Sequence, residues 1–179
     1  MYLNNVNLRT SSAKYTMAMN LTDLNFRSPL AEDGMAVNEL IGRCPPLDTN
    51  SGYCNLLQCS DFSDTSIVAV TPDNEIVGFI SGYLPPQRPE TLFVWQVALD
   101  EKWRGKGLAR QMLSDLFERQ TNVSHLETTI SPGNTASEHL FKRFFESQNM
   151  MVEKTVRFSR KTHFANKHPD EVLYRGGPD

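Results

Sequence analysis

The feature that most constrains this chain is an apolar run that leads through a glycine-rich turn into an amphipathic helical pattern. These three parts lie at residues 91–99, 103–107 and 108–117. Glycines allow the backbone to approach an anion closely, and the first N–H groups and the macrodipole of a helix attract negative charge. Arg104, Lys106 and Arg110 add positive charge to the turn. The turn therefore predicts a phosphate-binding site, although a tight strand-to-helix connection without a ligand is the alternative interpretation.

Two common nucleotide sites do not fit this turn. It has neither the spacing nor the Ser or Thr after the lysine that a P-loop requires. It also lies in the middle of the chain, whereas a dinucleotide fingerprint opens a first βαβ unit and is followed by a ribose-binding acid. Nucleotide hydrolysis and dinucleotide binding are therefore disfavoured.

The rest of the chain predicts a mixed α/β domain. Two β-branched runs separated by the turn at residues 71–74 predict a hairpin, which the run at 91–99 extends to three antiparallel strands. Apolar residues at helical spacing predict helices at 36–44, 108–117 and 136–147, with a short helix within 47–59. Strand patterns lie at 24–27, 66–70, 75–84, 125–131, 150–158 and 171–174.

Composition sets further limits. The 179 residues suffice for one ordinary domain, which we assign to residues 24–179, after a flexible polar leader at 1–23. A net charge of −3 disfavours a nucleic-acid partner, and no stretch approaches the roughly 20 apolar residues of a membrane span. No signal-peptide pattern is found either, so we expect a cytoplasmic protein. The 3 cysteines and 4 histidines lack the spacing of a zinc site, and no metal is expected.

The glycine-rich turn resembles the pyrophosphate-binding motif of the GCN5-related N-acetyltransferases (GNAT), Arg/Gln-x-x-Gly-x-Gly/Ala. Arg104, Gly107 and Ala109 occupy its positions, and the sequence around Asn134 is similar to the family's coenzyme-binding asparagine with the helix after it. The resemblance implies the acyl-CoA N-acyltransferase fold, a central, mostly antiparallel twisted sheet flanked by helices. It also implies acetyl-CoA as cosubstrate and an amine as the acetyl acceptor.

In this family the pantetheine arm of the coenzyme pairs with the strand that precedes the turn. The resemblance assigns that pairing to Val97 and Leu99, and it directs the Val97 backbone N–H at the thioester oxygen, where negative charge develops. Many relatives carry a tyrosine that protonates the departing thiolate where this chain has Phe141, so the source of that proton stays open. The coenzyme contacts that the resemblance implies are Val97, Leu99, Arg104, Gly105, Lys106, Gly107, Leu108, Ala109, Arg110, Asn134, Ser137 and Phe141.

Residues 26–175 resemble one branch of the family more closely, the diaminobutyrate acetyltransferases of ectoine biosynthesis. The most particular match is the segment 44–54, CPPLDTNSGYC. A small diamino acid presents two ammonium groups and a carboxylate, so its pocket needs anionic acceptors as well as hydrogen-bond donors. The resemblance implies five substrate-binding residues, which are Asp48, Tyr53, Trp95, His168 and Glu171.

These five residues have separate implied roles and separate alternatives. Asp48 and Glu171 are expected to hold the ammonium groups, and either of them to accept the amine proton before attack. Trp95 is expected to pack along the methylene chain, and Tyr53 and His168 to make polar contacts. Alternatively, Asp48 caps the following helix, the two aromatic residues belong to the core, and His168 and Glu171 are exposed charges.

The implied reaction is direct attack of the amine on acetyl-CoA within a ternary complex. No acyl-enzyme is expected, because none of the cysteines lies beside a His and Asp/Asn constellation. Two other functions stay open, which are acetylation of a different amine (a polyamine, an aminoglycoside or a protein amine) and acyl-CoA sensing without catalysis. The resemblance also implies a homodimer with a role in the response to osmotic stress.

Overall fold

The computed structural model describes residues 20–178. The predicted leader at residues 1–23 lies outside this range except for its last four residues. Of these, Leu21–Asp23 forms a short 3₁₀ helix, η1, and Leu21 packs against the hydrophobic core beside Leu24. The packed part of the described chain therefore begins before the predicted domain boundary at Leu24.

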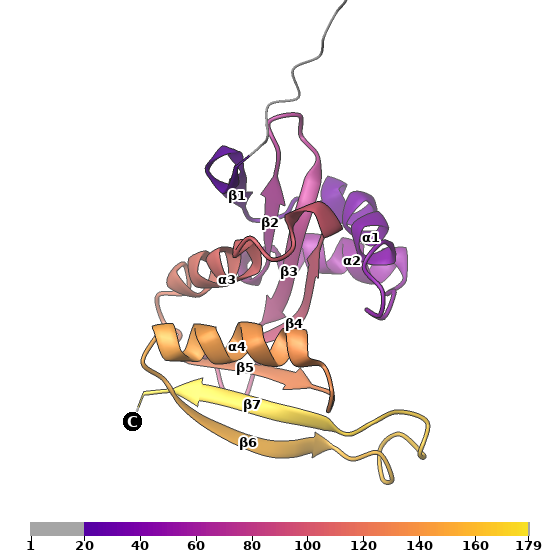
Figure 1. Cartoon of the computed structure of the whole chain (residues 1–179), viewed down its shortest axis with the longest axis vertical. Coiled ribbons are helices and arrows are strands. Elements are labelled where there is room, and N and C mark those ends of the chain that lie inside the picture. Colours follow the sequence, from indigo (N-terminus) through magenta and orange to yellow (C-terminus); the bar gives the residue numbers. More distant parts are fainter. Residues whose placement is uncertain (1–19, 179) are drawn as a thin grey trace, which may run out of the picture.

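A mixed sheet of seven strands forms the centre of the described chain (Figure 1). Its spatial order is β1-β2-β3-β4-β5-β7-β6, and every neighbouring pair is antiparallel except β4 and β5. The strands are β1 Asn25–Arg27, β2 Ile67–Val70, β3 Ile76–Tyr83, β4 Thr91–Leu99, β5 His125–Ile130, β6 Met151–Phe158 and β7 Glu171–Gly177. The fold class expected from the sequence is thus confirmed.

Within residues 20–178, four α-helices cover the sheet (Figure 1), and three further 3₁₀ helices lie in the connections. The α-helices are α1 Gly34–Gly42, α2 Gly52–Ser60, α3 Leu108–Glu118 and α4 Thr135–Ser147. The 3₁₀ helices are η2 Ala31–Asp33, η3 Ser63–Thr65 and η4 Glu101–Trp103. Of the helices at residues 20–178, none combines the length and the apolar character that a bilayer crossing requires.

The helices form two cores, one on each face of the sheet. Alternate residues of a strand point to opposite faces, so Ile67 and Ala69 pack with α3 and α4 whereas Val68 and Val70 pack with α1. α3 connects β4 to β5 across one face, which makes these two strands parallel. The strands predicted at 91–99 and 125–131 and the helix predicted at 108–117 are therefore confirmed, and together they form a strand-helix-strand crossover.

The largest difference from the predicted elements is at the C-terminal strand. β7 continues to Gly177, three residues beyond the predicted end at Tyr174. Glycines weaken a strand pattern, but here they are required by space. A Cβ at Gly176 would lie 2.3 Å from the Phe145 ring, and one at Gly177 would lie 2.2 Å from the His125 ring.

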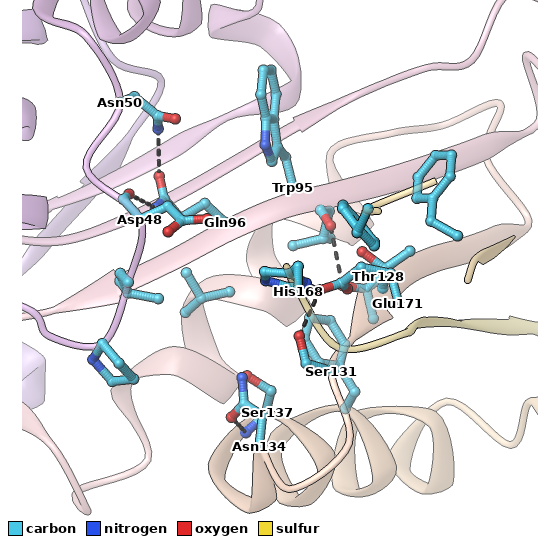
Figure 2. Close-up of a pocket in the computed structure, with 18 of the residues that line it drawn as sticks. Asp48, Asn50, Trp95, Gln96, Thr128, Ser131, Asn134, Ser137, His168 and Glu171 are labelled. Carbon is cyan, nitrogen blue, oxygen red and sulfur yellow. Dashed lines mark hydrogen bonds and ion pairs between the residues drawn. The ribbon is translucent and has the colours of Figure 1, made fainter. Parts of the chain in front are cut away.

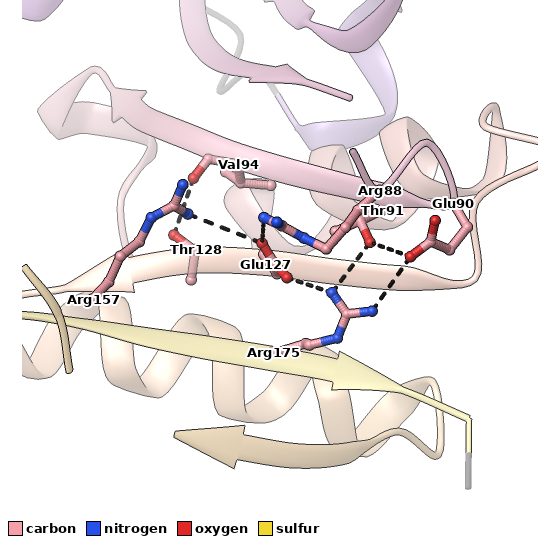
Figure 3. A network of polar contacts seen from close by, with 8 residues as sticks. All are labelled: Arg88, Glu90, Thr91, Val94, Glu127, Thr128, Arg157 and Arg175. Carbon is pink, nitrogen blue, oxygen red and sulfur yellow. Dashed lines mark hydrogen bonds and ion pairs between the residues drawn. The ribbon is translucent and has the colours of Figure 1, made fainter. Parts of the chain in front are cut away.

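A charged network lies on the face of β5 that is opposite to its contacts with α4 (Figure 3). Glu127 is only 1% exposed and accepts hydrogen bonds from Arg175 and, at 2.8 Å, from Arg88. Arg157 is 4.0 Å from the same carboxylate, and Arg175 also pairs with Glu90 at 3.5 Å. A buried carboxylate requires such partners, and these join β5 to β6, β7 and the β3–β4 connection.

Candidate active site

β4 separates from β5 about halfway along its length. The parallel pairing ends at Val94 and Thr128. A bulge opposite Ser81 and Gly82 makes Trp95 an extra residue in β4, and within the described chain the rest of β4 pairs with β3 alone. The second half of β4 therefore has one unpaired edge, to which an extended ligand can add like a strand.

The groups on this open edge are those that the sequence predicted. The Asp100 N–H donates to a carbonyl of β3 at 2.9 Å. In an antiparallel pair, every second residue of a strand directs its backbone N–H and C=O groups at the same neighbouring strand. The backbone groups of Val97 and Leu99 therefore point away from β3, toward the open edge. The Leu99 carbonyl accepts from Arg104 Nε and from Cys44 Sγ, both at 3.1 Å. Val97 therefore offers both backbone groups to a ligand, and Leu99 offers its N–H.

The turn after β4 has the conformation of an anion-binding loop. Gly105 and Gly107 have φ angles of 73° and 87°, in the left-handed region that disfavours side chains. A Cβ at either position would meet nothing within 4 Å, so the backbone there is also open to a ligand. Leu108, Ala109 and Arg110 begin α3, and their N–H groups have no helical carbonyl to bind. These groups fit a pyrophosphate.

Three basic side chains surround this turn. Arg104, Lys106 and Arg110 are exposed. Arg104 is held against the strand by its bond to the Leu99 carbonyl, and Lys106 lies 5.3 Å from the centre of the Trp103 ring. The turn thus combines backbone donors with positive charge, as its sequence predicted.

The N-terminal end of α4 carries the other residues that the resemblance assigns to the coenzyme. Asn134 caps this helix, because its Oδ1 accepts from the Ser137 N–H at 3.1 Å. Phe141 follows along the helix, is 3% exposed and packs beside Phe145 with ring centres 6.3 Å apart. All three predicted coenzyme residues of α4 line the cleft described next, and Phe141 brings no hydroxyl group to it.

A cleft of about 740 Å³ joins the open edge of β4 to the acceptor residues (Figure 2). It lies between β4, β5, the start of α4, the connection from α1 to α2 and the connection from β6 to β7. Its lining includes Asp48, Trp95, Val97, Asn134, Ser137, Phe141, His168 and Glu171 from the predicted set. One cleft therefore contains both the predicted coenzyme strand and the predicted acceptor carboxylates.

Glu171 is held firmly in this cleft. It is the first residue of β7, and its Oε1 accepts from the Ser131 hydroxyl at 2.5 Å. His168 Nδ1 lies 3.9 Å from the same oxygen and 3.0 Å from the Pro169 carbonyl. The Glu171 side chain is only 18% exposed, so a cationic group that enters the cleft meets a partly desolvated carboxylate.

Asp48 lies on the opposite side of the cleft, in the connection between α1 and α2. Its carbonyl accepts from Gln96 Nε2 at 3.0 Å, and Gln96 also accepts from Asn50 Nδ2 at 2.9 Å. The alternative role of Asp48 as a helix cap is wrong, because Ser51 caps α2 by accepting from the Cys54 N–H at 3.2 Å. Asp48 is exposed and lines the cleft.

The two predicted aromatic residues differ in position. Trp95 lines the cleft and is 50% exposed, with its ring edge-on to Tyr83 at 6.4 Å. Tyr53 is 70% exposed on α2, and the described lining of the cleft does not include it. Neither residue belongs to the core, so that alternative is wrong for both.

Several lining residues have no counterpart in the sequence prediction. They lie on β4, on β5 and just after it, at the end of β6, in the connection from β6 to β7 and, for Asn50, in the connection from α1 to α2. They are Asn50, Gln96, Thr128, Thr129, Ser131, Phe158, His163 and Phe164. Of these residues, the aromatic ones at 158–168 could have been found from the sequence. Four rings lie close together there in a polar stretch, without the periodic spacing of residues that face a core.

The cysteines take no part in this cleft. Cys44 and Cys59 are buried and all three thiols are free. Burial raises the pKa of Cys59 to about 12, with a further rise from the nearby Asp33 carboxylate that the Arg27 charge opposes. Among residues 20–178, no cluster of three or more His, Cys, Asp or Glu side chains is arranged to hold a metal ion.

Known proteins are similar to this chain in both sequence and structure. The model of the Acetyltransferase (GNAT) family matches residues 35–145. The L-2,4-diaminobutyric acid acetyltransferase of Methylotuvimicrobium alcaliphilum is 48% identical over 87% of this chain and 91% of its own length. That of Vibrio parahaemolyticus is 45% identical over 84% and 83%.

A solved structure agrees with these relatives. It is diaminobutyrate acetyltransferase EctA from Paenibacillus lautus in complex with its substrate L-2,4-diaminobutyric acid and coenzyme A, and it is 40% identical to this chain. The match has a TM-score of 0.81 and covers 87% of this chain and 95% of the other. This chain therefore belongs to the GNAT family of acetyltransferases and, within it, to the L-2,4-diaminobutyric acid acetyltransferases.

Proposed function

We propose that this protein transfers the acetyl group of acetyl-CoA to the γ-amine of L-2,4-diaminobutyrate and releases N4-acetyl-2,4-diaminobutyrate, a step of ectoine biosynthesis. The observation that carries this proposal is the single cleft in which the open edge of β4 faces two carboxylates, Asp48 and Glu171. The acetyltransferase relatives that share most of the chain support the same reaction.

The coenzyme half of the site consists of backbone groups. Acetyl-CoA supplies the activated acetyl group, and its pyrophosphate suits the N–H groups at the start of α3 and the left-handed Gly105 and Gly107. The pantetheine arm suits the edge groups of Val97 and Leu99. In this position the Val97 N–H stabilises the oxygen that gains negative charge, which lowers the barrier to attack.

The acceptor half has the charge that a diamine requires. Diaminobutyrate carries two ammonium groups, and Asp48 and Glu171 offer one carboxylate on each side of the cleft. Trp95 and the rings of Phe158 and Phe164 provide apolar surface for the short methylene chain. This aromatic lining suits a short methylene chain better than a polyhydroxylated aminoglycoside.

The γ-amine must lose a proton before it attacks. A lysine-like pKa of about 10.4 leaves little free base at neutral pH, so a carboxylate that accepts this proton directly or through water increases the rate. Glu171 and Asp48 are the candidates within the cleft. Phe141 cannot protonate the departing thiolate, whose basicity is low enough for water to serve that purpose.

The test is acetyl transfer by the purified protein. Acetyl-CoA is incubated with diaminobutyrate, lysine, ornithine, spermidine or kanamycin, and the released thiol is measured. NMR of the product then distinguishes γ-acetylation from α-acetylation. We expect a clear preference for diaminobutyrate and γ-acetylation. A preference for another amine overturns the acceptor, and coenzyme binding without turnover on any amine favours a sensor.

We also propose that the protein is a homodimer and acts in the cytoplasm, where acetyl-CoA is used. β6 supports the first point. It is an edge strand of the sheet, and outside the cleft it exposes three large apolar side chains, Met151, Val152 and Val156. Large apolar side chains on an exposed edge strand are normally covered, and a second copy of the chain is the simplest cover.

A further inference from the structure

We propose that Gln96 is a positioning residue that fixes the distance between the acceptor carboxylate of Asp48 and the coenzyme strand. Gln96 lies on β4 directly before Val97, the residue whose N–H faces the thioester in the proposed function. Its side chain binds the acceptor loop, residues 45–51, at two points. Gln96 Nε2 donates to the Asp48 carbonyl at 3.0 Å, and Gln96 Oε1 accepts from Asn50 Nδ2 at 2.9 Å (Figure 2).

The Gln96 contacts belong to a longer series of side-chain amides. Asn38 of α1 donates to the Asn50 carbonyl at 3.0 Å and to Asn55 Oδ1 at 2.8 Å, and Asn55 of α2 donates to Gln58 Oε1 at 2.8 Å. Asn55 and Gln58 are 0% and 1% exposed. Gln58 Nε2 has no partner within the described residues, but the other amide groups named here are hydrogen-bonded, and because buried amides are unfavourable without such bonds, the series holds α1, α2 and the acceptor loop in one arrangement.

The acceptor loop needs this support because it has no regular secondary structure. Within the loop, Leu47 donates its N–H to the Cys44 carbonyl at 3.0 Å and packs against the α1 core. Neither contact fixes Asp48, which follows Leu47 and is exposed. The Gln96 bond to the Asp48 carbonyl connects this residue directly to β4. A carboxylate that moves away from the substrate's ammonium group loses a charge-assisted hydrogen bond, so the Gln96 bond supports substrate binding.

Two other roles for Gln96 make different predictions. If the amide only holds the fold together, its loss lowers the melting temperature and leaves the KM of the folded enzyme unchanged. If Gln96 contacts the substrate directly, its loss raises KM whether or not Asp48 is present. A positioning role predicts that the effect on KM depends on Asp48, which a double-mutant cycle measures.

The test uses Gln96→Ala, Asp48→Ala and the double variant of the full chain. Loss of two hydrogen bonds is expected to raise the KM for diaminobutyrate roughly tenfold. The affinity for CoA stays within about twofold, since the edge of β4 is unchanged. In the Asp48→Ala background the same substitution is expected to change KM by less than about twofold. The control is Gln87→Ala, an exposed amide in the β3–β4 connection.

A second variant removes the possibility of direct contact. Asn38 binds the Asn50 carbonyl but does not line the cleft. Asn38→Ala is therefore expected to raise the KM for diaminobutyrate in the same direction, by a smaller factor, when it is assayed well below its melting temperature. An unchanged KM in Gln96→Ala, or a tenfold rise that persists without Asp48, overturns the proposal.

Because the inference rests on the proposed function, one measurement does not use the substrate. Hydrogen exchange of a peptide that covers residues 45–51 is expected to be faster in Gln96→Ala than in the wild type or in Gln87→Ala. Unchanged exchange contradicts the link between Gln96 and the loop. A wild-type protein that does not acetylate diaminobutyrate but shows the exchange difference overturns the proposed function alone.

Discussion

Glu171 is the residue whose surroundings most clearly favour binding of an ammonium group. Its carboxylate is partly buried, accepts the Ser131 hydroxyl and lies next to His168 in the cleft. We expect Glu171→Ala to raise the KM for diaminobutyrate by about tenfold to a hundredfold, because a hydrogen bond to a charged group contributes about 1.5–3 kcal/mol. The affinity for CoA should stay unchanged in calorimetry.

The matched control for this prediction is Glu153→Ala. Glu153 is exposed on β6 and does not line the cleft. Steady-state kinetics of the two variants are compared at saturating acetyl-CoA. Equal KM values for diaminobutyrate in both variants and the wild type remove Glu171 from the acceptor site.

The three thiols provide a second prediction at this scale. The pKa of Cys59, raised to about 12, leaves roughly one thiolate in ten thousand at pH 8, whereas Cys54 is partly exposed. Iodoacetamide at pH 8 should therefore modify Cys54 first and reach Cys44 and Cys59 only after unfolding. Peptide mass spectrometry measures the order. Cys54→Ser should keep its activity, and acetylated cysteine in protein treated with acetyl-CoA alone contradicts direct transfer.

At the scale of elements, the affinity for CoA is expected to depend on the left-handed backbone conformation of the turn between β4 and α3. Gly107 is in the left-handed region and its Cβ position is open, so Gly107→Ala changes the conformational preference without a steric clash. We expect a loss of about 1–2 kcal/mol of unfolding free energy and a weaker affinity for CoA, because the turn moves toward a right-handed conformation. Thermal unfolding and calorimetry with CoA measure both effects.

Gly42 in α1 offers the matched control for that substitution. A Cβ there also meets nothing within 4 Å, and its backbone is helical. Gly42→Ala should therefore raise stability by up to about 1 kcal/mol and leave CoA affinity unchanged. If both variants behave alike, the left-handed turn is not what binds the coenzyme.

The elements differ in how well the sequence predicts them. Helical periodicity predicted α3 closely, because this helix buries one apolar face, and a continuous apolar run predicted β4, whose first four residues are all buried. The end of β7 was not predicted, because Gly176 is required there by the close approach of the Phe145 ring, and a contact between distant residues leaves no local sequence pattern. Asn50 and Gln96 were missed for a related reason, as their amides meet only after two distant segments pack together. The place of Tyr53, outside the described cleft, likewise depends on how α2 packs.

At the scale of the whole molecule, the two halves of the sheet are covered unequally. β2, β3 and β4 lie between α1 on one face and α3 on the other. In contrast, β5 and β7 are covered by α4 on one face (Figure 1). The opposite face of β5 and β7 has the network around Glu127, and β6 forms an exposed edge beside it. This uneven cover is typical of a subunit that completes its core by association.

If the apolar side chains of β6 lie in the dimer interface, a charge introduced at Val156 should separate the subunits. Val156 is 57% exposed in the single chain, and an aspartate there would place an unpaired carboxylate in an apolar contact. We expect Val156→Asp to be monomeric by size-exclusion chromatography with light scattering, with unchanged secondary structure by circular dichroism. Leu30→Asp is the matched control, because Leu30 is 56% exposed but lies before η2, away from β6 in the sheet order. A dimeric Val156→Asp, or a monomeric wild type, would show that a second copy of the chain does not cover β6.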